Sequence, residues 1–307
     1  MQTAPIHNQQ QASALLHHEI TTDLHGLQRL LVAYDSSNAA AKSLRYAIAL
    51  AKAFDAEVII AHVETPQVIG GRMDDGLANI KLEQAEERHD LQMITNHLKQ
   101  EGIKASYLIR SGSPTDLLVQ LVGEYKPDLI LMGAYGHHAA ERITLGSTAE
   151  YLLRCLNCPV LVVGPSVADP PPHGVRLSEI LYASSLPVNP ARTQNFIRDL
   201  ARRFAMHVHI VHVETYGGLS SDRGHLHDLE MQEENIADHF RCNGIGSSWT
   251  LRFGSREHHL LDQANAVSAD LVCFGIIHPA TDPSQMGLLS ALIRSARCPI
   301  LTVPGAT

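Results

Sequence analysis

Three glycines and two hydroxyl residues are spaced along the chain in a way that suits the binding of a phosphate. Gly133 and Gly136 follow an apolar run, and after nine intervening residues Gly146, Ser147 and Thr148 open a segment with helical periodicity. Glycine lets a backbone approach a phosphate closely and adopt positive φ, and the free amides of a helix N-terminus attract an anion. Taken singly, each pair is better explained as a tight turn or a helix cap. The combined pattern G-x2-G-x9-G-S predicts a phosphate loop.

An acidic residue is expected opposite this loop. Asp35 ends the first apolar run, and Gly133 follows the fourth. If these two runs are neighbouring parallel strands, their ends meet at one edge of a sheet. Asp35 could there accept hydrogen bonds from a ribose or hold a metal ion beside phosphates. The two positions together predict a nucleotide site.

Short apolar runs alternate with helical periodicity and determine where these residues meet. This alternation predicts a parallel sheet with helices on both faces, and right-handed crossovers favour the doubly wound strand order 3-2-1-4-5. The first and fourth strands are then neighbours at the switch point, where ligands bind. The expected strands span Arg29–Tyr34, Val58–Val63, Ser106–Arg110, Leu129–Met132 and Val160–Val163.

The chain repeats itself. Four blocks recur in the same order at offsets between 140 and 150, which predicts two fused copies of one α/β domain. We expect a flexible tail over 1–27, a first domain over 28–164, a proline-rich linker over 165–177 and a second domain over 178–307. The matching blocks are AEVIIAHVET with MHVHIVHVET, LIRSG with TLRFG, DLILMG with DLVCFG, and CPVLVV with CPILTV.

At residues 28–307 the chain resembles a tandem universal stress protein. The resemblance is carried by LLVAYDSS (Leu30–Ser37), VIIAHV (Val58–Val63), RSGSP (Arg110–Pro114) and MGAYGHHAAERITLGST (Met132–Thr148). It implies two Rossmann-like, five-stranded domains of the adenine nucleotide alpha hydrolase type. It also implies ATP as the ligand, with Mg²⁺ left open.

The same resemblance implies the residues of the site. Arg142 is expected either to reach the phosphates or to be a solvated loop arginine. By similarity, Ala33, Tyr34 and Asp35 border adenine and ribose, Val63 and Met132 line the adenine pocket, and Gly133, Gly136, Gly146, Ser147 and Thr148 wrap the ribose and phosphates.

The second copy departs from this pattern. Asp35 corresponds to Ser185, Gly136 to His278, and the Gly146-Ser147 pair to Met286-Gly287. We therefore expect it not to bind ATP in the family's manner. Family members commonly dimerise through the fifth strand, so Val160–Val163 and Pro299–Val303 could pair within one chain as a pseudo-dimer. A further homodimer is left open.

Composition narrows the class of protein. The 307 residues carry a formal net charge of −8, which argues against a general nucleic-acid surface. No apolar run approaches the ~18 residues needed to cross a bilayer, and residues 1–27 lack the features of a secretion signal. Five cysteines argue against a disulfide framework and favour the cytoplasm. No P-loop, dinucleotide fingerprint or kinase signature is present.

Cysteine and histidine patterns are interpreted conservatively. Cys155 and Cys158 are expected to be structural, with Cys155 near the apolar face of a helix. The repeated His62 and His212 are expected to be hydrogen-bonded core histidines. Adjacent histidine pairs are poor two-point ligands, so no metal site is assigned.

Three functions remain open. The leading hypothesis is an ATP-binding stress or signalling module that acts through an unknown protein partner, with one live and one silent domain. The alternatives are a slow ATPase or autophosphorylating enzyme on the same site, and an interaction scaffold that ignores nucleotide. No catalytic residue is assigned.

Overall fold

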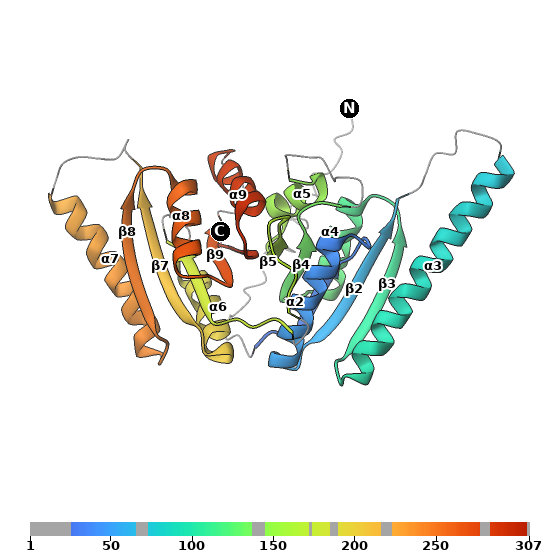
Figure 1. Ribbon diagram of the computed structural model, residues 1–307, viewed down its shortest axis with the longest axis horizontal. Coiled ribbons are helices and arrows are strands. Elements are labelled where there is room, and N and C mark those ends of the chain that lie inside the picture. The colour runs from blue at the N-terminus through green and yellow to red at the C-terminus, as the bar shows by residue number, and fades with distance from the viewer. Residues whose placement is uncertain are drawn as a thin grey trace, which may run out of the picture.

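In the computed structural model, two successive series of β-α units contribute their strands to one continuous sheet (Figure 1). The structure describes residues 26–65, 73–136, 145–171, 174–184, 190–215, 223–276 and 283–305. Within these ranges the sheet has the order β3-β2-β1-β4-β5-β10-β9-β6-β7-β8. Figure 1 shows α3 and α7 at the two far ends of the molecule.

The N-terminal half follows the predicted alternation closely. Ser37 accepts a hydrogen bond from the N–H of Ala40 and thereby caps the helix that follows β1. Its elements are β1 (Arg29–Ala33), α2 (Asn38–Phe54), β2 (Glu57–Glu64), α3 (Met73–Gln100), β3 (Ala105–Ser111), α4 (Pro114–Tyr125), β4 (Leu129–Gly133), α5 (Ser147–Cys155) and β5 (Val160–Val163).

The C-terminal half repeats the same order of elements. They are β6 (Glu179–Ala183), α6 (Pro190–Phe204), β7 (His207–Glu214), α7 (Arg223–Cys242), β8 (Ser247–Phe253), α8 (Arg256–Ala266), β9 (Leu271–Ile276), α9 (Pro283–Ser295) and β10 (Ile300–Pro304). Within each half all strand pairs are parallel, so the doubly wound order is confirmed twice.

Helices cover both faces of the sheet. One face carries a core shared by α2, α3, α6 and α7, for which Leu44, Leu91 and Phe240 are typical members. The other face carries a core shared by α4, α5, α8 and α9, with Leu152 and Leu289 fully buried. Because successive strand residues point to opposite faces, each strand contributes alternately to the two cores.

The two halves join through their last strands. β5 and β10 pair antiparallel, with Leu161 opposite Leu301, so the predicted intramolecular pairing is confirmed. The pairing covers two edges that would otherwise be exposed. Phe54 of α2 also meets Phe204 of α6 edge to face, with 6.1 Å between ring centroids. The halves therefore share both a sheet and a helix contact.

The segment between the halves packs against the N-terminal half. Val167 and Leu177 are buried in the core on the α2 side. Lys42 of α2 donates to the Val167 carbonyl at 2.7 Å and pairs with Asp169 at 3.4 Å. The described part of the predicted linker is thus anchored to α2 and to the core.

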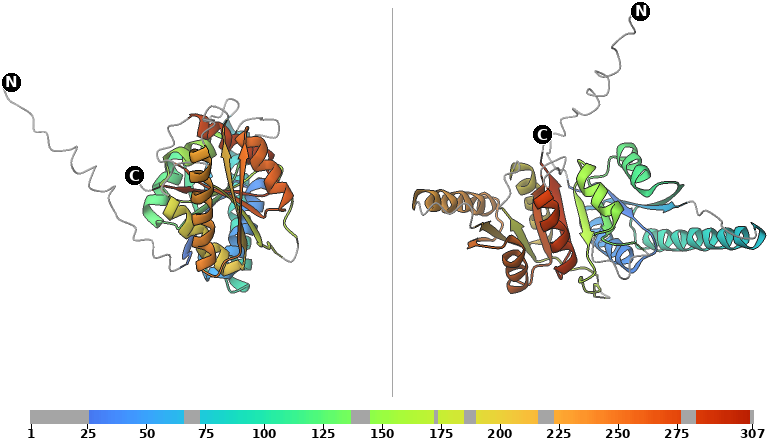
Figure 2. Two further views of the ribbon diagram at one scale, coloured as in Figure 1. Left: turned by 90° about the vertical axis from the view of Figure 1, so that its left-hand side faces the viewer. Right: turned by 90° about the horizontal axis from the view of Figure 1, so that it is seen from above.

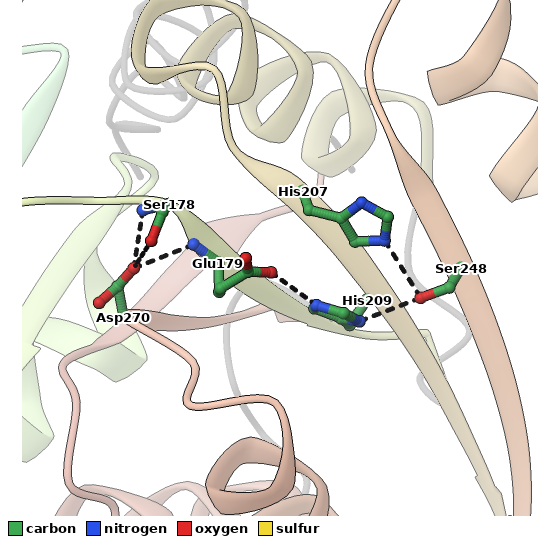
Figure 3. A network of polar contacts seen from close by, with 6 residues as sticks. All are labelled: Ser178, Glu179, His207, His209, Ser248 and Asp270. Atoms are coloured by element: carbon green, nitrogen blue, oxygen red, sulfur yellow. Dashed lines mark hydrogen bonds and ion pairs between the residues drawn. The ribbon is translucent and has the colours of Figure 1, made fainter.

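A carboxylate anchors the first strand of each half, and Figure 3 shows the one in the C-terminal half. Asp128 Oδ2 accepts hydrogen bonds from two peptide N–H groups at the start of β1, both at 2.8 Å. Asp270 Oδ2 accepts hydrogen bonds from the N–H groups of Ser178 and Glu179 at 2.7 and 2.9 Å, and from the Ser178 hydroxyl at 2.9 Å. These bonds fix the first strand of each half against its fourth.

A polar row continues from this anchor across the C-terminal half (Figure 3). His209 Nε2 lies 2.7 Å from Glu179 Oε2, and its Nδ1 lies 3.0 Å from Ser248 Oγ. His207 Nε2 lies 3.3 Å from the same hydroxyl. The row therefore links the starts of β6, β7 and β8.

Within the described ranges, every helix is too short or too polar to cross a bilayer.

Candidate nucleotide-binding site

The C-terminal ends of β1 and β4 lie side by side, as the predicted site requires. Ala33 pairs with Met132 in the parallel register, so the residues that follow each strand leave the sheet at one edge. The chain goes from β1 to β2 on one side and returns to β4 on the other. This arrangement is the switch point at which doubly wound sheets bind ligands.

Asp35 is held in place by the turn that follows β1. Its Oδ1 accepts the N–H of Ser37 at 3.1 Å, and Ser36 between them adopts a left-handed conformation with φ 62°. Its other oxygen faces the loop after β4, because a Cβ placed on Gly136 would lie 2.8 Å from Asp35 Oδ2. The structure thus brings the predicted acid and the second loop glycine together.

The loop glycines lie where the backbone passes so close to neighbouring parts of the chain that a side chain would not fit. A Cβ on Gly133 would lie 2.7 Å from the Cβ of Ala39 in the first turn of α2. Gly146 has φ −61° and ψ 142°, and its N–H donates to the Ala134 carbonyl at 3.0 Å. None of Gly133, Gly136 and Gly146 adopts the positive φ that glycine permits, and Gly146 is extended just before the first turn of α5. Its role is to let the chain pass the Ala134 carbonyl.

The start of α5 presents peptide amides without a side-chain cap. Gly146 occupies the cap position, and the first intrahelical bond runs from the Glu150 N–H to its carbonyl at 2.9 Å. The N–H groups of residues 147 to 149 therefore have no acceptor within the helix. Ser147 is exposed and Thr148 is half-buried, so both side chains of this turn are at least partly accessible to a ligand.

An acidic residue stands in the same first turn. Glu150 is ion-paired with Arg154 at 2.9 Å, one turn further along α5. Its negative charge, unfavourable beside an anion, is thus partly compensated from within the helix.

The predicted adenine-lining residues lie on one face of the sheet. Ala33, Val63 and Met132 all pack on the face that α4 and α5 cover, at the C-terminal ends of three adjacent strands. Together these three residues form an apolar surface, called the apolar floor below, next to Asp35 and the loop glycines.

Tyr34 does not join this floor. Its side chain packs on the opposite face, and its backbone N–H and carbonyl are bonded to Ala61 and His62, both at 2.9 Å. Burial raises the pKa of the Tyr34 phenol, and the negative charges of Asp90 and Asp35 raise it further. Tyr34 follows Ala33 directly, so the alternation of a strand directs it to the other side.

Several expected contributors lie outside the described residues. Arg142 and the histidine pair 137–138 belong to the segment 137–144, and Ser185 and His278 of the second copy also lie outside. Among the described residues, no group of three His, Cys, Asp or Glu side chains could hold a metal ion.

The cysteines carry no reactive thiol pair. All five are free, and burial raises the pKa of the Cys158 thiol to about 12. The structural interpretation of Cys158 therefore stands. Cys155 is exposed rather than near the apolar face, because Leu152 and Leu153 occupy that face of α5.

Comparison with known proteins decides the family. A sequence model of the universal stress protein family matches residues 26–164. A universal stress protein of Methanocaldococcus jannaschii is 31% identical over 138 residues, which cover 44% of this chain and 81% of that protein. The chain belongs to the universal stress protein family. The structure holds two tandem α/β domains of this kind.

Solved universal stress proteins share this architecture. A crystal structure from Archaeoglobus fulgidus superimposes with a TM-score of 0.68 at 20% identity, covering 90% of this chain and 98% of that one. A universal stress protein solved in complex with cAMP is 26% identical and has a TM-score of 0.35. It covers 45% of this chain and 97% of its own. The first likeness extends over both halves and supports the tandem fold.

The second universal stress protein domain begins its last helix differently. α9 starts at Pro283, so Met286 and Gly287, which align with the loop glycine and serine, lie within the helix. Met286 is buried in the core, and the Gly287 N–H lies where amides bond within the helix. The free amides that open α5 thus have no equivalent at Met286-Gly287.

A buried polar network occupies the same end of the second domain. Ser184 Oγ donates to Glu233 Oε2 at 2.6 Å, and His212 Nδ1 lies 3.0 Å from Glu233 Oε1. Glu233 is fully buried. Sequence reasoning placed His212 correctly as a bonded core histidine but missed Glu233. Its position four residues after buried Leu229 was the available signal, since that spacing puts it on the apolar stripe of α7.

His62 fills the corresponding place in the first domain. Its Nδ1 lies 2.9 Å from the Tyr34 carbonyl oxygen and its Nε2 lies 3.2 Å from Glu87 Oε2. It is 6% exposed, so the prediction of a hydrogen-bonded core histidine is confirmed in both domains.

Proposed function

We propose that this protein is a nucleotide-dependent stress or signalling module that binds ATP in its N-terminal domain. The observation that carries this proposal is the contact between Asp35 and Gly136. Because Gly136 carries no side chain, the loop after β4 lies close to the Asp35 carboxylate, and in sequence the same loop leads to the uncapped amides that open α5. The proposed site therefore combines an acid that can accept hydrogen bonds from ribose hydroxyls with amides that can donate to phosphate, at the C-terminal edge of β1 and β4.

ATP fits the chemistry of this arrangement. The apolar floor of Ala33, Val63 and Met132 suits the adenine ring. Amides 147–149 and the hydroxyls of Ser147 and Thr148 offer several donors, which suits a polyphosphate better than a single carboxylate. A carboxylate oxygen is a ligand that Mg²⁺ prefers, so Asp35 would help to hold Mg²⁺ if the ion binds beside the phosphates.

The C-terminal domain is proposed to be silent toward ATP. Met286 and Gly287 lie inside α9, and the Ser184–Glu233–His212 network fills its strand ends with paired polar groups. One nucleotide per chain is therefore expected.

Native mass spectrometry of the freshly purified protein, followed by titration with ATP, tests the proposal. Gly136→Ala should weaken ATP binding by about tenfold or more, because its Cβ would press on the Asp35 carboxylate. Gly287→Ala is the matched control, since a Cβ there meets nothing within 4 Å. A chain that binds no adenine nucleotide, or binds two, would contradict the proposal.

Phosphate release by the same preparation separates a binding module from an enzyme. We expect tight binding with negligible turnover. Sustained ATP hydrolysis that disappears in Asp35→Ala would show the chain to be a slow ATPase instead.

A further inference from the structure

The last turn of α9 lies against the end of β5, close to the nucleotide loop of the other domain. A Cβ on Gly164 would fall 1.9 Å from the Ile293 carbonyl oxygen, so the two backbones are in direct contact. Ser166 Oγ donates to the Arg294 carbonyl at 2.9 Å. In Figures 1 and 2, α9 and α5 lie on either side of the junction between the halves.

The end of β5 is in turn bonded to the loop itself. Gly133 pairs with Val163 in the sheet register, and the Ala134 N–H donates to the Val163 carbonyl at 2.9 Å. Tyr135 packs against the core cluster to which Ile293 contributes. Backbone contacts thus run from the loop through the end of β5 to the last turn of α9.

Arg294 brings a positive charge to this place. Its side chain is exposed, in the last turn of α9. Burial raises the pKa of the Tyr135 phenol, and the positive charge of Arg294 acts against this rise. Because Tyr135 lies between Ala134 and Gly136, the guanidinium is within electrostatic range of the loop.

We propose that Arg294, contributed by the C-terminal domain, is a specificity-determining cation for the phosphates of a nucleotide bound in the N-terminal domain. This inference rests on the proposed nucleotide site. A guanidinium beside the loop attracts a di- or triphosphate more strongly than a monophosphate, because the attraction grows with the charge of the ligand. The domain that is silent toward ATP thereby completes the site of its neighbour.

Calorimetric titration of ATP and AMP into the full chain tests this. Arg294→Ala should weaken ATP binding by about tenfold and AMP binding by about threefold or less. Arg294→Lys keeps the charge and should recover most of the ATP affinity at low salt, whereas Arg294→Gln should behave like the alanine variant. Arg297→Ala, another exposed arginine just after α9, should leave both affinities unchanged.

The outcomes separate the two proposals. If wild-type protein binds neither nucleotide, the proposed function fails and the role of Arg294 fails with it. If the wild type binds ATP and Arg294→Ala binds it equally well, only the role of Arg294 is overturned. Equal losses for ATP and AMP would also overturn it, since damage to the loop would affect both ligands. Should the alanine variant fail to fold, the comparison of the lysine and glutamine variants decides.

Discussion

At the scale of single residues, the two halves keep the same anchoring carboxylate. Asp128 and Asp270 each precede the fourth strand of their half and accept the N–H groups that begin the first strand. The surrounding residues have changed, and the C-terminal half adds the His209–Glu179 contact beside the anchor (Figure 3). The shared block DLILMG or DLVCFG signalled the repeat, but its aspartate's role emerged only from the contacts.

Removing the anchor should be costly. Asp270→Ala removes the acceptor of three hydrogen bonds and leaves partly buried donors unsatisfied. We expect the free energy of unfolding to fall by about 2 to 3 kcal/mol, as for hydrogen bonds to a charged group. Urea denaturation measures this. Asp262→Ala removes an exposed carboxylate of α8, 62% accessible, and should change stability by no more than about 0.5 kcal/mol. Similar losses in both variants would refute the anchoring role.

At the scale of elements, α7 carries a buried charge where α3 carries a half-exposed one. Glu233 is fully buried, whereas the Glu87 side chain is 37% exposed. Burial lowers the pKa of His212, but hydrogen bonds and attraction to Glu233 and Glu214 outweigh it, so the net shift is upward. Tyr182, whose pKa is raised mainly by burial, also lies within the field of Glu233. Folding therefore favours the protonated form of His212, and the stability of the C-terminal domain depends on pH.

This dependence gives stability a defined pH profile. With a folded pKa above the ordinary 6.5, the contribution of His212 is fully present below about pH 6.5 and is lost as pH rises through the folded pKa. Glu233→Gln removes the charge partner and should flatten this part of the profile. Urea denaturation between pH 6 and pH 9 is the measurement. Glu230→Gln, an exposed position on the same helix, should keep the wild-type slope. An unchanged slope in Glu233→Gln would show that the network does not titrate.

At the scale of the whole molecule, the junction makes one unit of two domains. β5 and β10 close the central edges, and Gly164 lets α9 touch the first domain. β3 and β8 remain the outer strands of the sheet in the described chain. The pseudo-dimer is thus built through backbone contacts as well as side-chain packing.

The junction should be sensitive to a single methyl group. Gly164→Ala would place a Cβ 1.9 Å from the Ile293 oxygen and force the halves apart. We expect a loss of about 2 to 3 kcal/mol in the free energy of unfolding. Gly123→Ala is the matched control, because a Cβ there meets nothing within 4 Å. Within α4 that change should stabilise the protein by about 0.5 to 1 kcal/mol. If Gly164→Ala left the free energy of unfolding unchanged, the backbone contact between Gly164 and Ile293 would not be needed to hold the halves together.

The sequence by itself determined the strands, their order and the duplication of the domain. Apolar runs and glycine spacing are local signals, so the strand positions and the meeting of Asp35 with Gly136 could be inferred. The side chain of Tyr34 packs on the opposite face from Ala33, Val63 and Met132, and a family motif does not state which face each side chain takes.

Tertiary structure alone decided which residues from distant elements meet. The bond between Glu233 and His212, the close contact of Gly164 with Ile293, and the bond from Ser166 to the Arg294 carbonyl all join residues from different elements of the chain. Such meetings depend on how two domains pack, and packing is a property of three-dimensional shape that no short sequence window encodes.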